Sequence, residues 1–465
     1  MESRSPAERW LQSCWGEDMH QVTKLRAIDD ENGLITRAGC TAPRPKSIAE
    51  TGLSLSFLAE LLEKHMYEAG VLTLGSMIKR TALAGPIVEE VLNFLRREGR
   101  IEVRARTMDE HGLRYALTER GRASAGVALE RSGYVGAAPV PLEVYTEVVR
   151  IQSVRDRLVT RARMHAAFAD IVLDPAILDR LGPALNAGKA LFVYGDAGTG
   201  KTFITQRLAR LMDDAALIPH AIAVGDAVIQ MFDATVHVPL QKPEPAVLLD
   251  DGYDSRFVLC RRPLVITGGE LAADMLEVQF DPAARRYQAP LQLKATNGMF
   301  ILDDLGRQRV APEVVLNRWI VPMEEGRDYL QLQSGHHFSV LFDLILVFST
   351  NLDPHELTDD AFLRRIGYKI QFTPLSEDQY HAIWKQVCAL HAVDYAPAIC
   401  QQVVDQLHRP SGTPLLPCHP RDLIDMALDH AAYLGTSDEL CIESLRWAWQ
   451  NYFLNSGNPS RHGAL

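Results

Sequence analysis

Residues 195–202 read Gly-Asp-Ala-Gly-Thr-Gly-Lys-Thr and match the pattern G-x-x-x-x-G-K-T at every fixed position. The apolar run 190–194 precedes them, and residues 203–212 after them have helical composition. A glycine-rich loop between a buried strand and a helix lets successive backbone N–H groups face one anion, and the helix N-terminus adds a partial positive charge. We therefore predict a phosphate-binding loop made of Gly195, Asp196, Ala197, Gly198, Thr199, Gly200, Lys201 and Thr202.

Two pairs of side chains extend this prediction to a nucleoside triphosphate with Mg²⁺. Lys201 can reach the β- and γ-phosphates, and the Thr202 hydroxyl can ligate the metal. Further along, the apolar strand 300–302 ends in Asp303 and Asp304. A buried parallel strand presents polar side chains at its carboxyl end, where ligands bind. We predict that Asp303 is the Mg²⁺ carboxylate and that Asp304 orients or deprotonates the attacking water; the alternative is a strand-end turn in which both are helix caps.

More polar residues follow in a defined order. The apolar strand 344–350 ends at Asn351, the segment 361–366 carries Arg364 and Arg365, and Arg421 lies at the start of a later helix. In this order and at these separations the set resembles the AAA+ ATPases, over roughly residues 155–455.

The resemblance implies roles for these residues. Asn351 would be the sensor 1 residue that contacts the γ-phosphate or the lytic water, and Arg421 would be the sensor 2 arginine. Arg364 or Arg365 would be the arginine finger that reaches the nucleotide of the neighbouring subunit, with Arg365 preferred. ATP and Mg²⁺ are the implied cofactors, and a homo-oligomer, a hexameric ring, is the implied assembly.

One position departs from the family pattern. The family usually has Asp-Glu at the end of the Walker B strand, whereas this chain has Asp303-Asp304. An aspartate is one methylene shorter than a glutamate, and general-base geometry is sensitive at about the ångström level. We expect ATP hydrolysis with slow turnover; the alternative is a nucleotide-gated switch that hydrolyses too slowly for mechanical work.

Two hairpins are predicted around these motifs. Residues 329–333 and 338–342 flank a turn and lead into the strand before Asn351, and residues 276–280 and 287–293 form a second alternating pair. A hairpin at the first place resembles the AAA+ branch of MoxR-type chaperones, magnesium-chelatase ATPases and enhancer-binding activators. In that branch such hairpins face the central pore and touch the client; the alternative is that both are scaffold.

The region before the ATPase motifs has its own pattern. Helices are predicted from residue 53 to 69, from 73 to 83 and from 86 to 98, followed by strands 101–106 and 115–118 around the turn 109–112. This arrangement resembles a winged-helix domain. Glu89 and Glu90 lie where a DNA reader contacts base edges, and acidic and basic residues balance over 47–135. We favour docking of an unknown protein client over DNA binding, which stays open as the less favoured alternative.

These patterns predict an α/β fold: an AAA+ P-loop parallel-sheet domain with a C-terminal helical lid and an N-terminal winged-helix domain. The expected function is to couple ATP hydrolysis to remodelling or assembly of a partner complex, or, alternatively, to help replication, transposition or transcription on DNA. The predicted segments are an arm (1–46), the winged helix (47–135), a linker and helix (136–165, helical over 142–164), the large ATPase domain (166–375), the lid (376–455) and a tail (456–465).

Composition limits the setting in which such a protein works. The chain has 465 residues and a formal net charge of −11, which disfavours broad electrostatic binding to nucleic acid or anionic membranes. Its apolar runs are shorter than a membrane span, and its first residues have no signal-peptide core. The seven scattered cysteines form neither a zinc spacing nor a disulfide framework. We therefore expect a cytoplasmic protein that does not insert into membranes.

Overall fold

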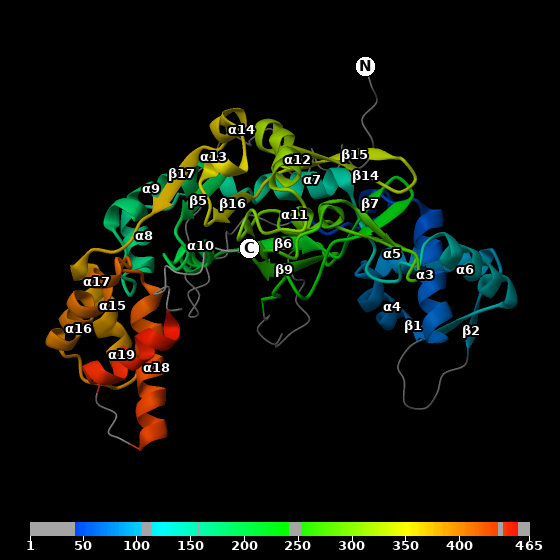
Figure 1. The fold of residues 1–465 in the computed structure, drawn as a ribbon. Helices are drawn as coiled ribbons and strands as arrows, with labels where there is room; N and C mark the ends of the chain where they lie inside the picture. Colours follow the sequence, from blue (N-terminus) through cyan, green and yellow to red (C-terminus); the bar gives the residue numbers. More distant parts are fainter. Residues whose placement is uncertain (1–41, 105–112, 157, 241–252, 436–439, 454–465) are drawn as a thin grey trace, which may run out of the picture.

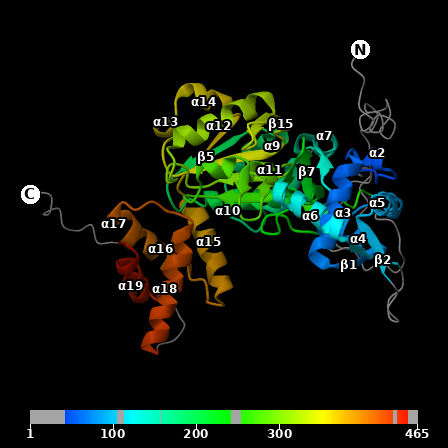
Figure 2. The same ribbon diagram turned by 90° about the vertical axis from the view of Figure 1, so that its right-hand side faces the viewer.

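The computed structural model describes residues 42–104, 113–156, 158–240, 253–435 and 440–453. Most of the predicted arm, the predicted wing turn and the predicted tail fall outside these ranges. The described chain forms a central α/β body, with an N-terminal unit on one side and a group of helices from the C-terminal region on the other (Figure 1). The two outer parts also lie apart when the molecule is turned by 90° (Figure 2). Within the described ranges, no helix is long and apolar enough to cross a membrane.

The N-terminal unit combines short helices with a three-stranded antiparallel sheet of order β1-β3-β2. Helix α3 begins after Ser54, whose hydroxyl accepts the Phe57 N–H at 3.1 Å, and ends before Gly70, whose φ of 79° suits glycine. The elements are α2 (Ile48–Thr51), α3 (Leu55–Ala69), β1 (Val71–Thr73), α4 (Leu74–Thr81), α5 (Gly85–Arg97), β2 (Ile101–Arg104), β3 (Arg114–Leu117) and α6 (Glu119–Arg131).

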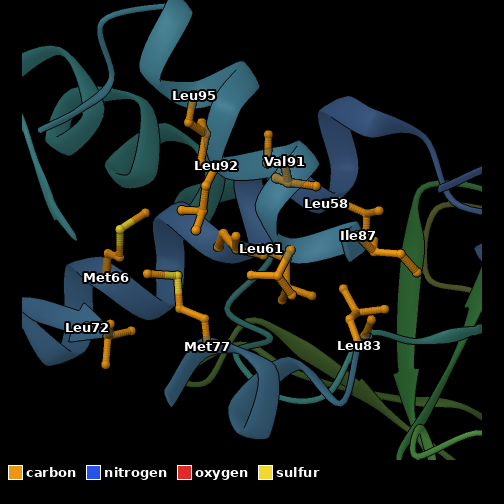
Figure 3. Packing of buried hydrophobic residues seen from close by; sticks show 14 of the residues in the cluster. Leu58, Leu61, Met66, Leu72, Met77, Leu83, Ile87, Val91, Leu92 and Leu95 are labelled. Atoms are coloured by element: carbon orange, nitrogen blue, oxygen red, sulfur yellow. The ribbon is translucent and has the colours of Figure 1, made fainter. Parts of the chain in front are cut away.

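The apolar faces of these helices meet in one core, where Leu58, Leu61, Ile87, Val91 and Leu95 are buried (Figure 3). This packing follows from apolar residues three and four apart on α3 and α5. Sequence analysis missed three elements of the unit, of which α2 is a four-residue helix that precedes the first predicted one. Strand β1 is too short to show an alternation, and α6 buries only small residues, Gly121, Ala125 and Ala128, so it has no apolar stripe.

The body is built on a five-stranded parallel sheet of order β10-β13-β16-β5-β17. Both faces are covered, which explains why the strands read as continuous apolar runs. Phe192, Phe300 and Phe348 pack on the side of α12 and α14, and Val193, Ile301 and Val347 pack on the side of α9 and α10. The elements are α9 (Pro175–Ala187), β5 (Leu191–Gly195), α10 (Lys201–Leu208), β10 (Leu264–Thr267), β13 (Met299–Leu302), α12 (Pro312–Glu325), β16 (Ile345–Thr350), α13 (Pro354–Leu357), α14 (Asp360–Arg365) and β17 (Tyr368–Phe372). The predicted α/β class with a parallel sheet is confirmed.

A second sheet of order β11-β12-β8-β7-β4 joins the body to the N-terminal unit. Sequence analysis did not predict three of its strands: β7 and β8, which come from the segment between α10 and β10, and the two-residue β4 in the linker. The second predicted hairpin supplies its edge, although the return strand is shorter than expected and residues 291–294 are helical. The strands of this sheet are β4 (Val140–Pro141), β7 (Ala221–Val224), β8 (Ala227–Gln230), β11 (Gln279–Asp281) and β12 (Arg286–Gln288). A separate antiparallel pair is formed by β6 (Ala215–Pro219) and β9 (Phe257–Arg261), and the short helices of this region are η2 (Ala209–Leu211), η3 (Ala273–Leu276) and α11 (Leu291–Lys294).

The hairpin predicted before Asn351 is formed by β14 (Arg327–Gln331) and β15 (His337–Leu341). One face is buried: Leu330 and Val340 pack in a core with Val144 and Tyr145 of α7 (Leu142–Ile151). The other face, with Tyr329, is exposed. The hairpin is therefore anchored through one face on α7, while its other face stays accessible.

The single helix expected over 142–164 is wrong. The chain forms α7, then the 3₁₀ turn η1 (Val154–Asp156), and then α8 (Arg161–Ala167). The break has a tertiary cause, because the Asp343 carboxylate accepts the Ser153 hydroxyl at 2.7 Å and the Val154 N–H at 3.0 Å. The backbone N–H of Val154 therefore bonds a carboxylate from a distant segment in place of a helical carbonyl, and the Ser153 hydroxyl bonds the same carboxylate.

The C-terminal region is helical, as expected for a lid. Ser376 and Gln379 form a capping box at the start of α15. Tyr380, Trp384, Leu423 and Leu445 are buried in a core separate from that of the parallel sheet. The elements are α15 (Glu377–Leu390), α16 (Pro397–Val403), the π-helical turn η4 (Val404–His408), α17 (Arg409–Ser411), α18 (Cys418–Leu434) and α19 (Ile442–Tyr452).

A buried arginine fixes the N-terminal unit to the body. Arg256, 1% exposed, pairs with Asp254 through Nε at 2.9 Å. Its Nη1 donates to the Thr51 carbonyl at 3.0 Å and to the Pro139 carbonyl at 3.2 Å. One side chain therefore contacts the N-terminal unit at Thr51, the linker at Pro139 and the segment before β9 at Asp254.

We expect Arg256→Ala to lower the free energy of unfolding by about 3–5 kcal/mol, because it leaves the buried Asp254 carboxylate without its counter-ion. Pulse proteolysis in urea measures the change. The control is Arg120→Ala, which removes a pair with Glu98 whose arginine side chain is 67% exposed, at a cost of about 0–1 kcal/mol. Equal urea midpoints for the two variants would contradict the docking role of Arg256.

Candidate functional site

The predicted phosphate loop runs from the end of β5 to the start of α10. Gly195, Gly198 and Gly200 have φ values of 136°, 83° and 86°, which L side chains rarely adopt. A Cβ on Gly195 would lie 2.1 Å from the Phe372 carbonyl oxygen of the neighbouring strand β17. Glycine is thus required for the shape of the loop and for its close approach to the sheet.

Lys201 is the first residue of α10, and its ammonium folds over the loop. Nζ donates to the carbonyls of Gly195 at 2.8 Å and Asp196 at 2.7 Å. Burial lowers the pKa of Lys201, while the charges of Asp303 and Asp304 oppose that shift. The Lys201 ammonium therefore lies at the loop, where the negative charges of Asp303 and Asp304 favour its charged form.

Thr202 and Asp303 meet, although the sequence separates them widely. The Thr202 hydroxyl donates to Asp303 Oδ2 at 2.7 Å. A hydroxyl and a carboxylate oxygen are ligands that suit Mg²⁺, which is usually held by one or two carboxylates together with waters and substrate phosphates. Among the described residues there is no group of three or more His, Cys, Asp or Glu that would form a cage for a metal. The pair fits Mg²⁺ as its protein ligands.

Asp304 has a left-handed backbone, with φ of 48°. Its Oδ1 accepts a hydrogen bond from Asn351 Nδ2 at 3.0 Å. Asp is among the non-glycine residues that tolerate this conformation best, whereas a longer side chain has no such local advantage. The aspartate at this position therefore agrees with the turn that follows β13, and the turn aims it at Asn351.

Sequence analysis missed the side chains that hold this turn. Gln308 Nε2 donates to the carbonyls of Asp303 and Asp304, each at 3.1 Å, and its Oε1 accepts the Gly306 N–H at 2.8 Å. The buried Thr350 hydroxyl donates to the Leu305 carbonyl at 2.7 Å. Such contacts have no short motif, so only the fold reveals them.

The two candidate finger residues lie outside this cluster, at the end of α14. Arg365 is engaged within the chain: Nε bonds Glu324 of α12 at 2.5 Å, and Nη1 donates to the Ala361 carbonyl at 2.8 Å. Arg364 is exposed and lines a surface depression of about 470 Å³ with Tyr194 and His355. No hydrogen bond or ion pair of its guanidinium is found within the described part of the chain.

Arg421 belongs to the first turn of α18, whose N-terminal end rests on the phosphate loop. A Cβ on Gly198 would lie 2.7 Å from Cys418 Sγ, and one on Gly200 would lie 3.9 Å from Pro417. The Arg421 side chain itself is 67% exposed and pairs with Asp422. The structure thus brings together the loop, Asp303, Asp304 and Asn351, and places Arg421 on the adjoining helix.

Comparison with known proteins gives a partial match. Residues 376–451 match a family described as a domain of unknown function (DUF8689). Among curated proteins, no relative matches the chain. Similar solved structures include the RuvB Holliday junction branch migration motor of Thermotoga maritima, at 12% identity and a TM-score of 0.33, covering 59% of this chain and 68% of that one. NtrX from Brucella abortus is similar at 10% identity and a TM-score of 0.37, covering 81% of this chain and 64% of that one. Likenesses of this size carry no functional statement.

Proposed function

We propose that this chain is an AAA+ ATPase that binds ATP with Mg²⁺ and hydrolyses it to remodel or assemble a partner protein complex. One observation carries the proposal. The phosphate loop, Asp303, Asp304 and Asn351 come from adjacent strands and converge at the carboxyl edge of one parallel sheet. Ligands bind at this edge in open α/β sheets.

Each residue has a chemical task in this proposal. The loop N–H groups and Lys201 hold the phosphates, and Thr202 and Asp303 would hold Mg²⁺, which neutralises phosphate charge when it is bound. Asp304 orients the attacking water and accepts its proton, and Asn351 fixes the Asp304 carboxylate through the 3.0 Å hydrogen bond. These groups act by position and charge, as phosphoryl transfer requires.

A protein client is favoured over DNA for the N-terminal unit. The exposed face of α5 is a shallow surface lined by Glu89, Glu90, Asn93, Arg96 and Arg97. The two carboxylates occupy the half of the helix that would approach base edges, where they would repel phosphates. Stimulation of ATP hydrolysis by duplex DNA at about 0.15 M salt would instead favour the DNA-associated alternative.

Lys201→Ala should weaken ATP binding by about 10- to 100-fold, because one charge-assisted set of phosphate contacts is lost. Isothermal titration calorimetry with ATP and Mg²⁺ measures the change. Lys189→Ala is the matched control: Lys189 is exposed and precedes β5 at its other end, so ATP affinity should stay the same. Wild-type affinity in Lys201→Ala would contradict the nucleotide site.

A further inference from the structure

Arg421 is held by a carboxylate that a second helix fixes in place. Arg421 Nε and Nη2 both donate to Asp422 Oδ1, at 3.0 and 2.9 Å. The other oxygen, Oδ2, accepts the Tyr452 hydroxyl at 2.9 Å, and Tyr452 belongs to α19. Asp422 is only 23% exposed, whereas Arg421 extends into solvent. The carboxylate is therefore anchored, and the guanidinium is the part that can move.

The location of this pair connects it to the nucleotide. Arg421 belongs to the end of α18 that contacts the phosphate loop through Pro417 and Cys418. A planar guanidinium uses the same fork of N–H donors for carboxylate and for phosphate. A triphosphate bound within reach of Arg421 would therefore compete with Asp422 for one cation.

We propose that Asp422, positioned by Tyr452, restrains Arg421 and so sets the affinity of the site for nucleoside triphosphates. The inference rests on the proposed function, since it concerns the same phosphate-binding site. Arg421 has to exchange the Asp422 oxygen for phosphate oxygens when the lid closes on ATP. An exposed ion pair is weak, so the restraint is small and reversible.

The test compares ATP and AMP binding to Asp422→Asn by isothermal titration calorimetry. Loss of the carboxylate frees Arg421, and ATP should bind about two- to fivefold more tightly. AMP lacks the β- and γ-phosphates, so its affinity should stay unchanged, which a general structural effect would not produce. Tyr452→Phe should shift ATP affinity in the same direction by a smaller factor, because Asp422 keeps its charge and loses only its anchor.

Two further variants separate the restraint from a general loss of negative charge. Asp429→Asn removes an exposed carboxylate two turns along the same helix and should leave ATP affinity unchanged. In an Arg421→Ala background, Asp422→Asn should give no gain, since its effect passes through Arg421.

Three results would overturn the inference: weaker ATP binding in Asp422→Asn, an equal gain for AMP, or a gain that persists without Arg421. Failure of the proposed function looks different, because wild-type protein would then bind no ATP, or Lys201→Ala would bind ATP like the wild type. Thermal unfolding of each variant confirms that it is folded. The two ideas can therefore fail independently.

Discussion

Asp304→Asn should lower ATP turnover by ~10²–10⁴-fold and leave ATP affinity within about twofold of the wild type. The amide does not accept the proton of the attacking water, and it loses the charge that Asn351 Nδ2 contacts at 3.0 Å. Binding is retained because the loop and Lys201 are unaltered. Phosphate release under saturating ATP and Mg²⁺ measures turnover, and calorimetry measures affinity.

The matched control for this variant is Asp353→Asn. Asp353 is exposed near the end of the neighbouring strand β16, where its side chain caps α13 by accepting the His355 N–H at 2.9 Å. Asparagine is as good a cap as aspartate, so both stability and turnover should be unchanged. Unchanged hydrolysis in Asp304→Asn would show that another group serves as the base, and very low wild-type turnover would favour the switch alternative.

Arg364→Ala should lower turnover by about 10³-fold or more in the assembled protein, the size expected for an arginine finger. Arg365→Ala should have a much smaller effect. The reason is availability: Arg365 is bound to Glu324 and to the Ala361 carbonyl, whereas Arg364 is exposed to solvent. This expectation reverses the preference for Arg365 drawn from the sequence.

Mixing experiments show whether the arginine acts between subunits. Arg364→Ala has intact phosphate loops, and Lys201→Ala has intact arginines, so a mixture should recover part of the activity that each variant lacks. Turnover per chain in the wild type should also rise with protein concentration as subunits assemble. A wild-type protein that is monomeric by light scattering and fully active would contradict an arginine finger that acts between subunits. A larger loss of turnover in Arg365→Ala than in Arg364→Ala would favour Arg365 as the finger.

Local patterns predicted much of the fold. Helices α3, α4 and α5 and the three central strands β13, β16 and β5 of the parallel sheet follow from apolar spacing and caps within one segment. The two edge strands, β10 and β17, were not predicted. The failures have tertiary causes or weak signals. The helix expected over 142–164 breaks because Asp343 binds Ser153 and Val154. Helix α6 was not predicted because it packs through small residues and has no apolar stripe.

The sequence by itself determined the phosphate loop and the strand-end side chains Asp303, Asp304 and Asn351, because a loop between a strand and a helix is specified by adjacent residues. Only the tertiary structure decided which of these groups touch. Thr202 bonds Asp303 across 101 residues because β5 and β13 lie on either side of β16 in one parallel sheet, so their carboxyl ends meet at the same edge. The left-handed turn at Asp304, the burial of Arg256 and the restraint on Arg421 likewise depend on partners far along the chain. Short motifs record what one segment does, whereas the contacts between segments are fixed by packing.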